Sequence, residues 1–429
     1  MKFTAVGDVA IQKRIFDGYE GFDELRPFIE KGDARFFNLE TTLNREGEAC
    51  ASQFSGGSYL RANPEVLDDL THFGFNMTTF NNNHSLDFFY SGFERTLDAL
   101  DKSKFVHTGA GRNLSEASAP VYLETENGKV ALISVSTTFV PSMMAGDPAP
   151  RVAGRPGING ISISSHIALT EDDFNYIKEL GSRTGVNIRK ETNRKEGYIP
   201  PLKEKECELG DMKFFLSDKA DFVMTANEKD LIRVEKAIAE AKENADYIMI
   251  SIHSHQLYGA SKETVPEFLK EISHRFIDAG ANAIIGHGPH LLRPIEVYKD
   301  CPIFYSLGDF VLQLYSMEFA PAEFFQKNGM STDASVYELL KKRSNNFTRG
   351  LMEDRRMLIS VIPYWESENG KLTKLTLLPI EIISNKDEDD SGLPRKCDGK
   401  EVCEYLSEMC IPYGTKLTLE ADGTISCKW

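Results

Sequence analysis

The chain has 429 residues, of which 41% are hydrophobic, enough to bury one large apolar core or two modest ones. Its formal net charge of -16 argues against a nucleic-acid partner, because binding to a phosphate backbone relies on clustered Lys and Arg. A local basic pocket could still bind an anionic small molecule or polymer. The overall charge therefore limits the partner class and leaves the substrate open.

The N-terminal residues leave no room for a secretion signal, because the apolar run at residues 3–6 leads directly into Gly7-Asp8. No later stretch approaches the roughly 20 apolar residues that a membrane-spanning helix needs. We therefore expect a cytoplasmic protein without membrane insertion. A chain trimmed of a natural membrane anchor would show the same pattern.

Apolar, β-branched-rich runs alternate with amphipathic stretches, a pattern that predicts an α/β core. The expected strands lie at residues 3–6, 34–38, 75–79, 130–136, 247–253 and 283–286, with two later ones at 357–363 and 375–383. The expected helices lie at residues 21–30, 64–73, 91–102, 229–244 and 265–279. Residues 141–226 have weaker periodicity and are predicted to form an insertion rather than core strands, which could cover or shape a substrate site.

Several expected strands end in polar or ionisable side chains, and this is the main functional signal of the sequence. The strand ends carry Asp8, Glu40, Asn83-His84, His253 with His255, and His287 with His290. In open α/β sheets, ligands gather beyond the carboxyl ends of strands, where the loops converge on one crevice. We therefore expect these side chains to face one site.

Carboxylate, amide and imidazole side chains on separate loops are the ligands that a two-metal hydrolase requires. Each residue alone has a simpler interpretation: Asp8 as a helix cap, Glu40 as a surface carboxylate, Asn83 as a turn residue. Four of the nine histidines, however, fall in two strand-end clusters. The order and clustering of these residues along the chain favour a metal site over a separate structural role for each residue.

These residues also lie in motifs that resemble the CapA/PgsA poly-γ-glutamate capsule family. In order, the motifs are Gly7-Asp8, Asn38-Leu39-Glu40, Asn82-Asn83-His84 with Asp87, His107-Thr108-Gly109-Ala110-Gly111, Gly286-His287-Gly288-Pro289-His290 and Tyr305-Ser306-Leu307-Gly308. That family is itself similar to calcineurin-like metallophosphoesterases. The resemblance implies a four-layer α/β sandwich of two mixed β-sheets flanked by helices. It also implies a catalytic domain at residues 1–320 and a C-terminal extension at 321–429 that packs on the core.

The resemblance implies a role for each residue of the predicted site. Asp8 and His290 would hold a first divalent metal, Asn83, His253 and His287 a second, and Glu40 would bridge them. His84 would protonate the leaving group or stabilise the transition state, steered by Asp87.

The sequence departs from the metallophosphoesterase pattern at three positions. Ala10 replaces a histidine, Glu40 replaces the bridging aspartate, and Asp309 stands where the family motif more often has Asn. Whether one or two metal ions bind therefore remains open, and Mn, Fe and Zn all suit the ligand set.

Two further residues have alternative interpretations. His255 would face the same side of a continuing strand as His253, so either could reach a metal, with His253 favoured. Arg155, in the expected insertion, could clamp a substrate phosphate or carboxylate, or could be a surface arginine in a turn.

The leading functional hypothesis is a metal-dependent hydrolase that cleaves a phosphoester or a γ-glutamyl or other amide bond through a metal-activated water. The alternative is a non-hydrolytic accessory or binding protein in poly-γ-glutamate synthesis or export. A purely structural metal is a third hypothesis, although structural sites usually have four tight ligands, often cysteines.

Overall fold

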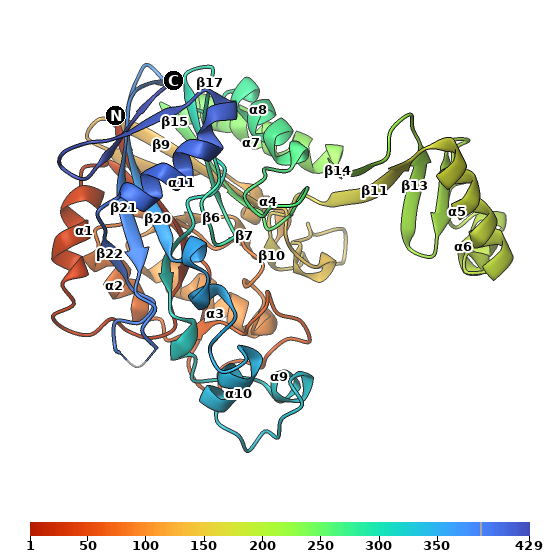
Figure 1. The fold of residues 1–429 in the computed structure, drawn as a ribbon, viewed down its shortest axis with the longest axis horizontal. Coiled ribbons are helices and arrows are strands. Elements are labelled where there is room, and N and C mark those ends of the chain that lie inside the picture. The colour runs from red at the N-terminus through yellow and green to blue at the C-terminus, as the bar shows by residue number, and fades with distance from the viewer. Residues whose placement is uncertain (387) are drawn as a thin grey trace.

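The computed structural model describes residues 1–386 and 388–429 (Figure 1). Among these residues, ten strands form one mixed sheet in the order β23-β24-β21-β20-β1-β2-β5-β6, with β19 paired to β1 and β22 to β21. Their bounds are β1 (Lys2–Ala10), β2 (Ala34–Leu39), β5 (Met77–Thr79), β6 (Val106–Thr108), β19 (Asp309–Leu312), β20 (Ile359–Glu368), β21 (Lys371–Ile382), β22 (Pro394–Lys396), β23 (Lys416–Leu419) and β24 (Ile425–Lys428). Strand β1 is parallel to β2 and antiparallel to β20.

A second mixed sheet has six strands among the described residues, in the order β17-β18-β16-β15-β9-β8. Its strands are β8 (Val121–Thr125), β9 (Gly128–Ser136), β15 (Tyr247–His253), β16 (Ala283–His287), β17 (Ile295–Tyr298) and β18 (Cys301–Phe304). Strand β15 is parallel to both β9 and β16, and the register places His253 opposite His287. The α/β class predicted from the sequence is confirmed.

The two sheets share an apolar core built by alternate residues of their central strands. Phe3 of β1 stacks on Tyr247 of β15 and on Trp365 of β20, with ring centroids 4.0 and 5.2 Å apart. The Trp365 indole N–H donates to the Tyr247 hydroxyl at 3.0 Å, so the polar atoms of both buried rings are satisfied. This contact fixes the two sheets relative to each other.

Helices cover the outer face of each sheet. Leu25, Leu70 and Leu97 belong to an apolar cluster outside the ten-stranded sheet, and Val234 and Phe276 belong to one outside the six-stranded sheet. The helices of the first face are α1 (Gly21–Ile29), α2 (Val66–His72) and α3 (Phe89–Lys102), and those of the second are α7 (Glu228–Asn244) and α8 (Glu267–Ala279). Helix α11 (Lys400–Cys410) contributes Leu406 to the core between the sheets.

Residues 163–226 form a lobe that projects from the sheets (Figure 1). Its sheet has the order β12-β13-β11-β14, with bounds β11 (Ile163–Leu169), β12 (Glu206–Leu209), β13 (Met212–Leu216) and β14 (Asp221–Ala226), beside α5 (Glu171–Thr184) and α6 (Ile188–Lys195). A small core of Phe174, Cys207 and Phe214 holds the lobe together. Sequence patterns did not predict these strands, because most of their side chains remain partly exposed and show little alternation.

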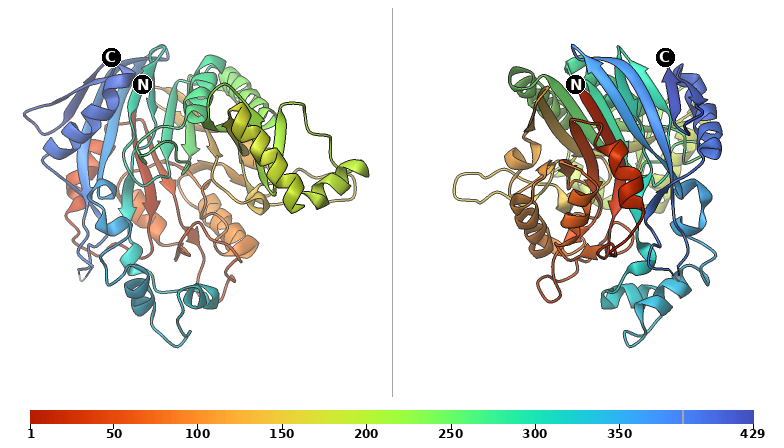
Figure 2. Two further views of the ribbon diagram at one scale, coloured as in Figure 1. Left: turned by 45° about the vertical axis from the view of Figure 1, so that its right-hand side comes forward. Right: turned by 90° about the vertical axis from the view of Figure 1, so that its left-hand side faces the viewer.

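The segment from residue 314 to 358 forms an apolar cluster with the loop before α3. Helices α9 (Ala322–Lys327) and α10 (Val336–Arg343) place Phe324 and Leu340 against Tyr59 and Phe88. Both views of Figure 2 show this segment at the end of the molecule opposite the two termini. The short elements are α4 (Leu114–Ser118), β3 (Thr42–Leu43), β4 (Arg61–Ala62), β7 (Ala110–Gly111), β10 (Gly157–Ile158) and the 3₁₀ turns at 141–143, 314–316, 351–353, 355–357 and 411–413.

The helices of the described part of the chain are all too short or too polar to cross a bilayer.

Candidate metal centre

The polar residues at the strand ends lie together between the two sheets. Asp8 lies in β1 where the pairing with β2 and β19 shifts register, and Glu40 directly follows β2. His253 and His287 are the last residues of the parallel strands β15 and β16. The carboxyl ends of β1 and β2 and of β15 and β16 therefore face each other, and their side chains meet.

A first group consists of Asp8, His253 and His287, all fully buried. Asp8 Oδ1 lies 3.2 Å from His287 Nδ1 and 3.6 Å from His253 Nδ1. The carboxylate is held in place because it accepts from Asn38 Nδ2 at 2.6 Å and from the Gly288 backbone N–H at 2.7 Å.

A second group surrounds Oε1 of Glu40. His253 Nε2 lies 3.6 Å and His255 Nε2 3.9 Å from this oxygen. Asn83 Oδ1 approaches the same two imidazole nitrogens at 2.6 and 3.2 Å. His255 is thus placed beside His253, so both histidines face Glu40.

A third group lies on the other side of Glu40 and consists of Asp8, Glu40, His290 and Asp309. Glu40 Oε2 is 4.0 Å from His290 Nδ1, which in turn lies 2.9 Å from Asp309 Oδ1. Asp309, where the family more often has Asn, is therefore the partner of a histidine of the centre.

The donor atoms fit a divalent metal. Both Glu40 oxygens and Asp309 Oδ2 are buried and, within the described residues, accept no hydrogen bond, although an unsatisfied buried carboxylate is costly. Imidazole nitrogens also face each other, with His253 Nδ1 2.9 Å from His287 Nδ1 and His253 Nε2 3.0 Å from His255 Nε2. A cation among these lone pairs would satisfy all of them.

The two central carboxylates titrate in opposite directions. Burial disfavours the charge of Asp8, but His253 and His287 hold the pKa of this carboxyl well below its usual value. Burial and the charge of Asp8 together raise the pKa of Glu40 well above its usual value. Without a metal, Asp8 carries the negative charge and Glu40 is the group that gains most from a cation.

The histidines also differ in charge. Burial lowers the pKa of His253 to about 4 and that of His255 well below its usual value, so both rings are neutral and their lone pairs are free for a metal at neutral pH. Burial opposes the charge of His290, yet Asp309 and Glu40 raise its pKa to about 10. Burial raises the pKa of Asp309 to about 6.

His84 lies at the edge of the centre in a fixed orientation. Its Nδ1 is 2.6 Å from Asp87 Oδ2, and its Nε2 faces Glu40 Oε1 at 4.0 Å. Asp87 is fully buried and also accepts from the backbone N–H groups of Gly56 and Leu60 at 3.0 and 2.8 Å. The carboxylate therefore sets both the ring orientation and the nitrogen that faces the site.

Arg155 lies outside the three groups. It is exposed, and its Nε donates to the Met144 carbonyl at 3.0 Å within the hairpin that links residues 146 and 155. The sequence reasoning did not single out Ser251, whose hydroxyl lies 2.7 Å from His287 Nε2. The sequence pattern that could have identified Ser251 is its position two residues before His253, which places both side chains on the same face of β15.

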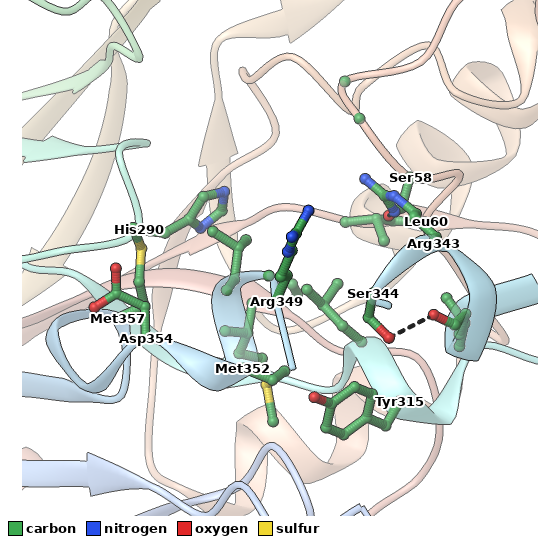
Figure 3. A pocket seen from close by; sticks show the side chains of 18 of the residues that line it. Ser58, Leu60, His290, Tyr315, Arg343, Ser344, Arg349, Met352, Asp354 and Met357 are labelled. Carbon is green, nitrogen blue, oxygen red and sulfur yellow. Dashed lines mark hydrogen bonds between the residues drawn. The ribbon is translucent and has the colours of Figure 1, made fainter. Parts of the chain in front are cut away.

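A cavity of about 530 Å³ opens beside the centre (Figure 3). His84 and His290 form one end, and Arg343, Arg349 and Lys262 line the remainder together with apolar side chains. Sequence reasoning missed these three cations because their segments carry no motif that links them to the strand ends.

The comparisons with known proteins identify the relatives of this chain. The family profile described as "Bacterial capsule synthesis protein PGA_cap" matches residues 2–314. The chain is 30% identical over 432 residues to the uncharacterized protein y4sH of Sinorhizobium fredii, covering 97% of this chain and 91% of the relative. It is 25% identical over 367 residues to the PGA biosynthesis protein CapA of Bacillus subtilis, covering 82% of this chain and 74% of the relative.

Among solved structures, a hypothetical protein from Thermus thermophilus aligns with a TM-score of 0.43 and 11% identity, over 89% of this chain and 99% of that chain. This likeness is too weak to carry an argument. The profile match and the full-length relative confirm the resemblance predicted from the motifs. The chain belongs to the bacterial capsule synthesis protein family PGA_cap.

Proposed function

We propose that this protein is a metal-dependent hydrolase that cleaves a phosphoester or a γ-glutamyl or other amide bond of an anionic substrate. The observation that carries the proposal is the buried Glu40 carboxylate, which accepts no hydrogen bond within the described residues and lies between two sets of metal-ligating atoms. Structural metal sites are usually closed by four tight ligands, whereas this centre opens on a cavity beside His84 and His290. Such an opening would let a substrate reach the metal centre.

Glu40 is proposed to bridge two ions of Mn, Fe or Zn. The support is that its Oε1 faces His253, its Oε2 faces His290, and each side has further oxygen or nitrogen atoms within reach. Asp8, His290 and Asp309 would hold one ion. Asn83, His253 and His255 would hold the other, because Asn83 and His255 face His253 Nε2, whereas His287 faces His253 Nδ1 beside Asp8. A single ion would use one side of Glu40.

When bound, the metal lowers the pKa of a water molecule and stabilises the negative charge that develops on the substrate. His84 supplies the proton to the leaving group, because Asp87 engages Nδ1 and leaves Nε2 facing the centre. Asn38 and the Gly288 N–H hold Asp8 in position. Asp87, Asn38 and Gly288 therefore fix the orientation of the His84 ring and of the Asp8 carboxylate.

The larger architecture is proposed to be a four-layer α/β sandwich of the metallophosphoesterase type. Three apolar cores support this, one between the sheets and one beneath the helices on each outer face. We propose the catalytic domain at residues 1–320, with an insertion at about 141–226 and an extension at 321–429. The pairing of β20 with β1 supports packing of the extension on the core.

The test combines metal content with turnover. Purified wild type, Asp8→Ala and His287→Ala are compared by elemental analysis and by a screen of generic phosphoesters and γ-glutamyl amides. His166→Ala, which changes a histidine of the projecting lobe, is the matched control. We expect metal and turnover in wild type and the control, and loss of both in the site variants. Undiminished turnover after replacing both His287 and His290 would refute the proposal.

The second candidate is a non-hydrolytic accessory protein that binds poly-γ-glutamate or a synthase partner. The observation in its favour is the name of the Bacillus subtilis relative, a PGA biosynthesis protein. A metal-free wild type that turns over none of the esters or amides and copurifies with a membrane synthase would support this candidate over hydrolysis.

A further inference from the structure

The cavity beside the metal centre concentrates positive charge in a strongly acidic protein. Lys262, Arg343 and Arg349 line it, whereas the chain as a whole carries a formal charge of -16. Within the described residues, none of these three cations forms an ion pair with a carboxylate. The carboxylate in the lining, Asp354, is already bound by Arg356 through Nε at 3.0 Å and Nη2 at 2.7 Å. Asp354 also feels the charge of Lys262, so among the described residues the two arginines are the cations of the cavity without a nearby carboxylate partner.

The two arginines differ in how they are held. Arg343, at the end of α10, donates from Nη1 to the Ser58 hydroxyl at 2.5 Å and lies over the Phe324 ring at 5.2 Å. Arg343 is exposed as a whole, yet partial burial of its guanidinium lowers the pKa of this group, and no carboxylate among the described residues pairs with it. Arg349 has no side-chain partner in the described part of the chain. In Figure 3 its guanidinium extends between His290 and Arg343.

Apolar side chains form much of the remaining wall, beside the hydroxyl groups of Ser58, Tyr315 and Ser344. Leu312, Leu314, Leu340, Leu351, Met352 and Met357 line it. A ligand in this space would therefore meet metal-ligating residues at one end and aliphatic side chains along its length. On the other side it would meet two guanidinium groups that no carboxylate pairs with among the described residues. Guanidinium groups recognise carboxylates and phosphates through paired N–H donors.

We infer that this cavity is a substrate subsite for a molecule that carries a second oxyanion, a carboxylate or a phosphate, separated from the scissile group by an apolar spacer. Arg343 and Arg349 bind the second oxyanion, and Lys262 adds positive charge. The inference rests on the proposed function for the scissile end, since it assigns the far end of the same substrate. Arg343 and Arg349 lie beyond residues 2–314, so the subsite uses a part of the chain that the family profile does not match.

Binding of three non-hydrolysable probes tests this inference. Phenylphosphonate has one oxyanion, 4-carboxyphenylphosphonate adds a distant carboxylate, and 1,4-phenylenebisphosphonate adds a distant phosphonate. Calorimetry in the presence of manganese measures each probe with the wild-type protein, Arg343→Gln, Arg349→Gln and the conservative Arg349→Lys. Lys341→Gln is the matched control, because Lys341 is an exposed cation on α10 that does not line the cavity.

We expect wild type to bind at least one two-headed probe about tenfold or more tightly than phenylphosphonate, as a charge-assisted hydrogen bond would give. The preferred probe identifies the second group as carboxylate or phosphate. The preference should disappear in Arg349→Gln, persist in part in Arg349→Lys and stay intact in Lys341→Gln. Arg349 is exposed and forms no side-chain hydrogen bond or ion pair within the described residues, so its replacement tests the inference even if Arg343→Gln unfolds.

Equal binding of all three probes to wild type would overturn the inference. So would a preference that survives in Arg349→Gln and Arg343→Gln, or one that Lys341→Gln removes equally. A parallel assay of phenyl phosphate and 4-carboxyphenyl phosphate hydrolysis separates the two proposals. If neither ester is cleaved but the binding preference follows the arginines, the subsite stands and phosphoester hydrolysis fails.

Discussion

Replacing Gly56 by alanine should damage the metal centre without disrupting the fold. A Cβ at this position would lie 2.4 Å from Asn83 Nδ2 and 2.7 Å from His84 Nε2, against the 3.4 Å at which ordinary contacts begin. The shortfall for Asn83 is therefore about 1 Å, and that side chain is already hydrogen bonded to the Gly56 carbonyl at 3.0 Å. Either Asn83 and His84 move away from the centre or the loop that carries Gly56 lifts.

The structure sets the size of the effect. A displacement of about 1 Å in a catalytic group costs roughly 100-fold in turnover. Loss of an oriented ligand costs about 10- to 100-fold in metal affinity. Overpacking at one loop position destabilises by about 1–3 kcal/mol, which a large domain tolerates. We therefore expect a folded protein with weak metal binding and little turnover.

The assay is a manganese titration of Gly56→Ala followed by turnover of whichever ester or amide the wild type cleaves. Gly146→Ala is the control, because its new Cβ would meet the flexible end of Arg155 at 3.3 Å, outside the three ligand groups. If Gly56→Ala binds manganese and turns over substrate like wild type, the placement of Asn83 and His84 in the centre is wrong.

The other predictions concern Glu40, His290 and His84. Glu40→Gln should lower the bound metal by at least one ion while the metal-free protein stays folded, since both Glu40 oxygens lack a hydrogen-bond partner within the described residues. Elemental analysis with a thermal unfolding scan checks this. A variant with the metal content of the wild type would count against the bridging role. Metal affinity should rise from pH 7 toward pH 10, because the pKa of His290 is about 10 and a proton must leave before the ring can bind a metal. The number of protons released during a metal titration should fall in Asp309→Asn, which removes a charge that raises this pKa. An unchanged proton release would contradict the prediction. Asp87→Asn should keep the metal but lower turnover by about 10- to 100-fold. One amide oxygen replaces the two carboxylate oxygens that accept from His84, Gly56 and Leu60, so the ring loses its charge-assisted hydrogen bond. Equal turnover in the variant and wild type would exclude Asp87 as the group that orients His84.

The candidate site could be predicted from the sequence because it depends on local order along the chain. Glu40 follows an apolar strand, Asp8 and His287 lie near the ends of two others, and parallel strands bring their carboxyl ends to one edge. The α/β class follows from the same alternation. The choice between His253 and His255 could not be made in this way, because the turn after β15 places both rings beside Asn83.

The cationic cavity could not be predicted, because its residues converge only through tertiary packing. Arg343 reaches Ser58 across 285 positions of sequence, and no periodic pattern encodes that contact. The constrained turn around Arg155 suggests a substrate clamp, yet the Nε of this arginine is bonded to the Met144 carbonyl. The sequence predicts an insertion at residues 141–226 but not the strands of the lobe at residues 163–226, because these strands have few fully buried residues.

The position of β1 beside β20 also bears on how the protein is made. β1 leaves the ribosome well before its neighbour β20, which begins at Ile359. At about 5–20 residues per second, roughly 20 to 70 seconds separate the synthesis of the two strands. During that interval one edge of β1 and the Phe3 ring lack their partners in β20, so the growing chain exposes an unpaired strand edge and an apolar ring until β20 has been made.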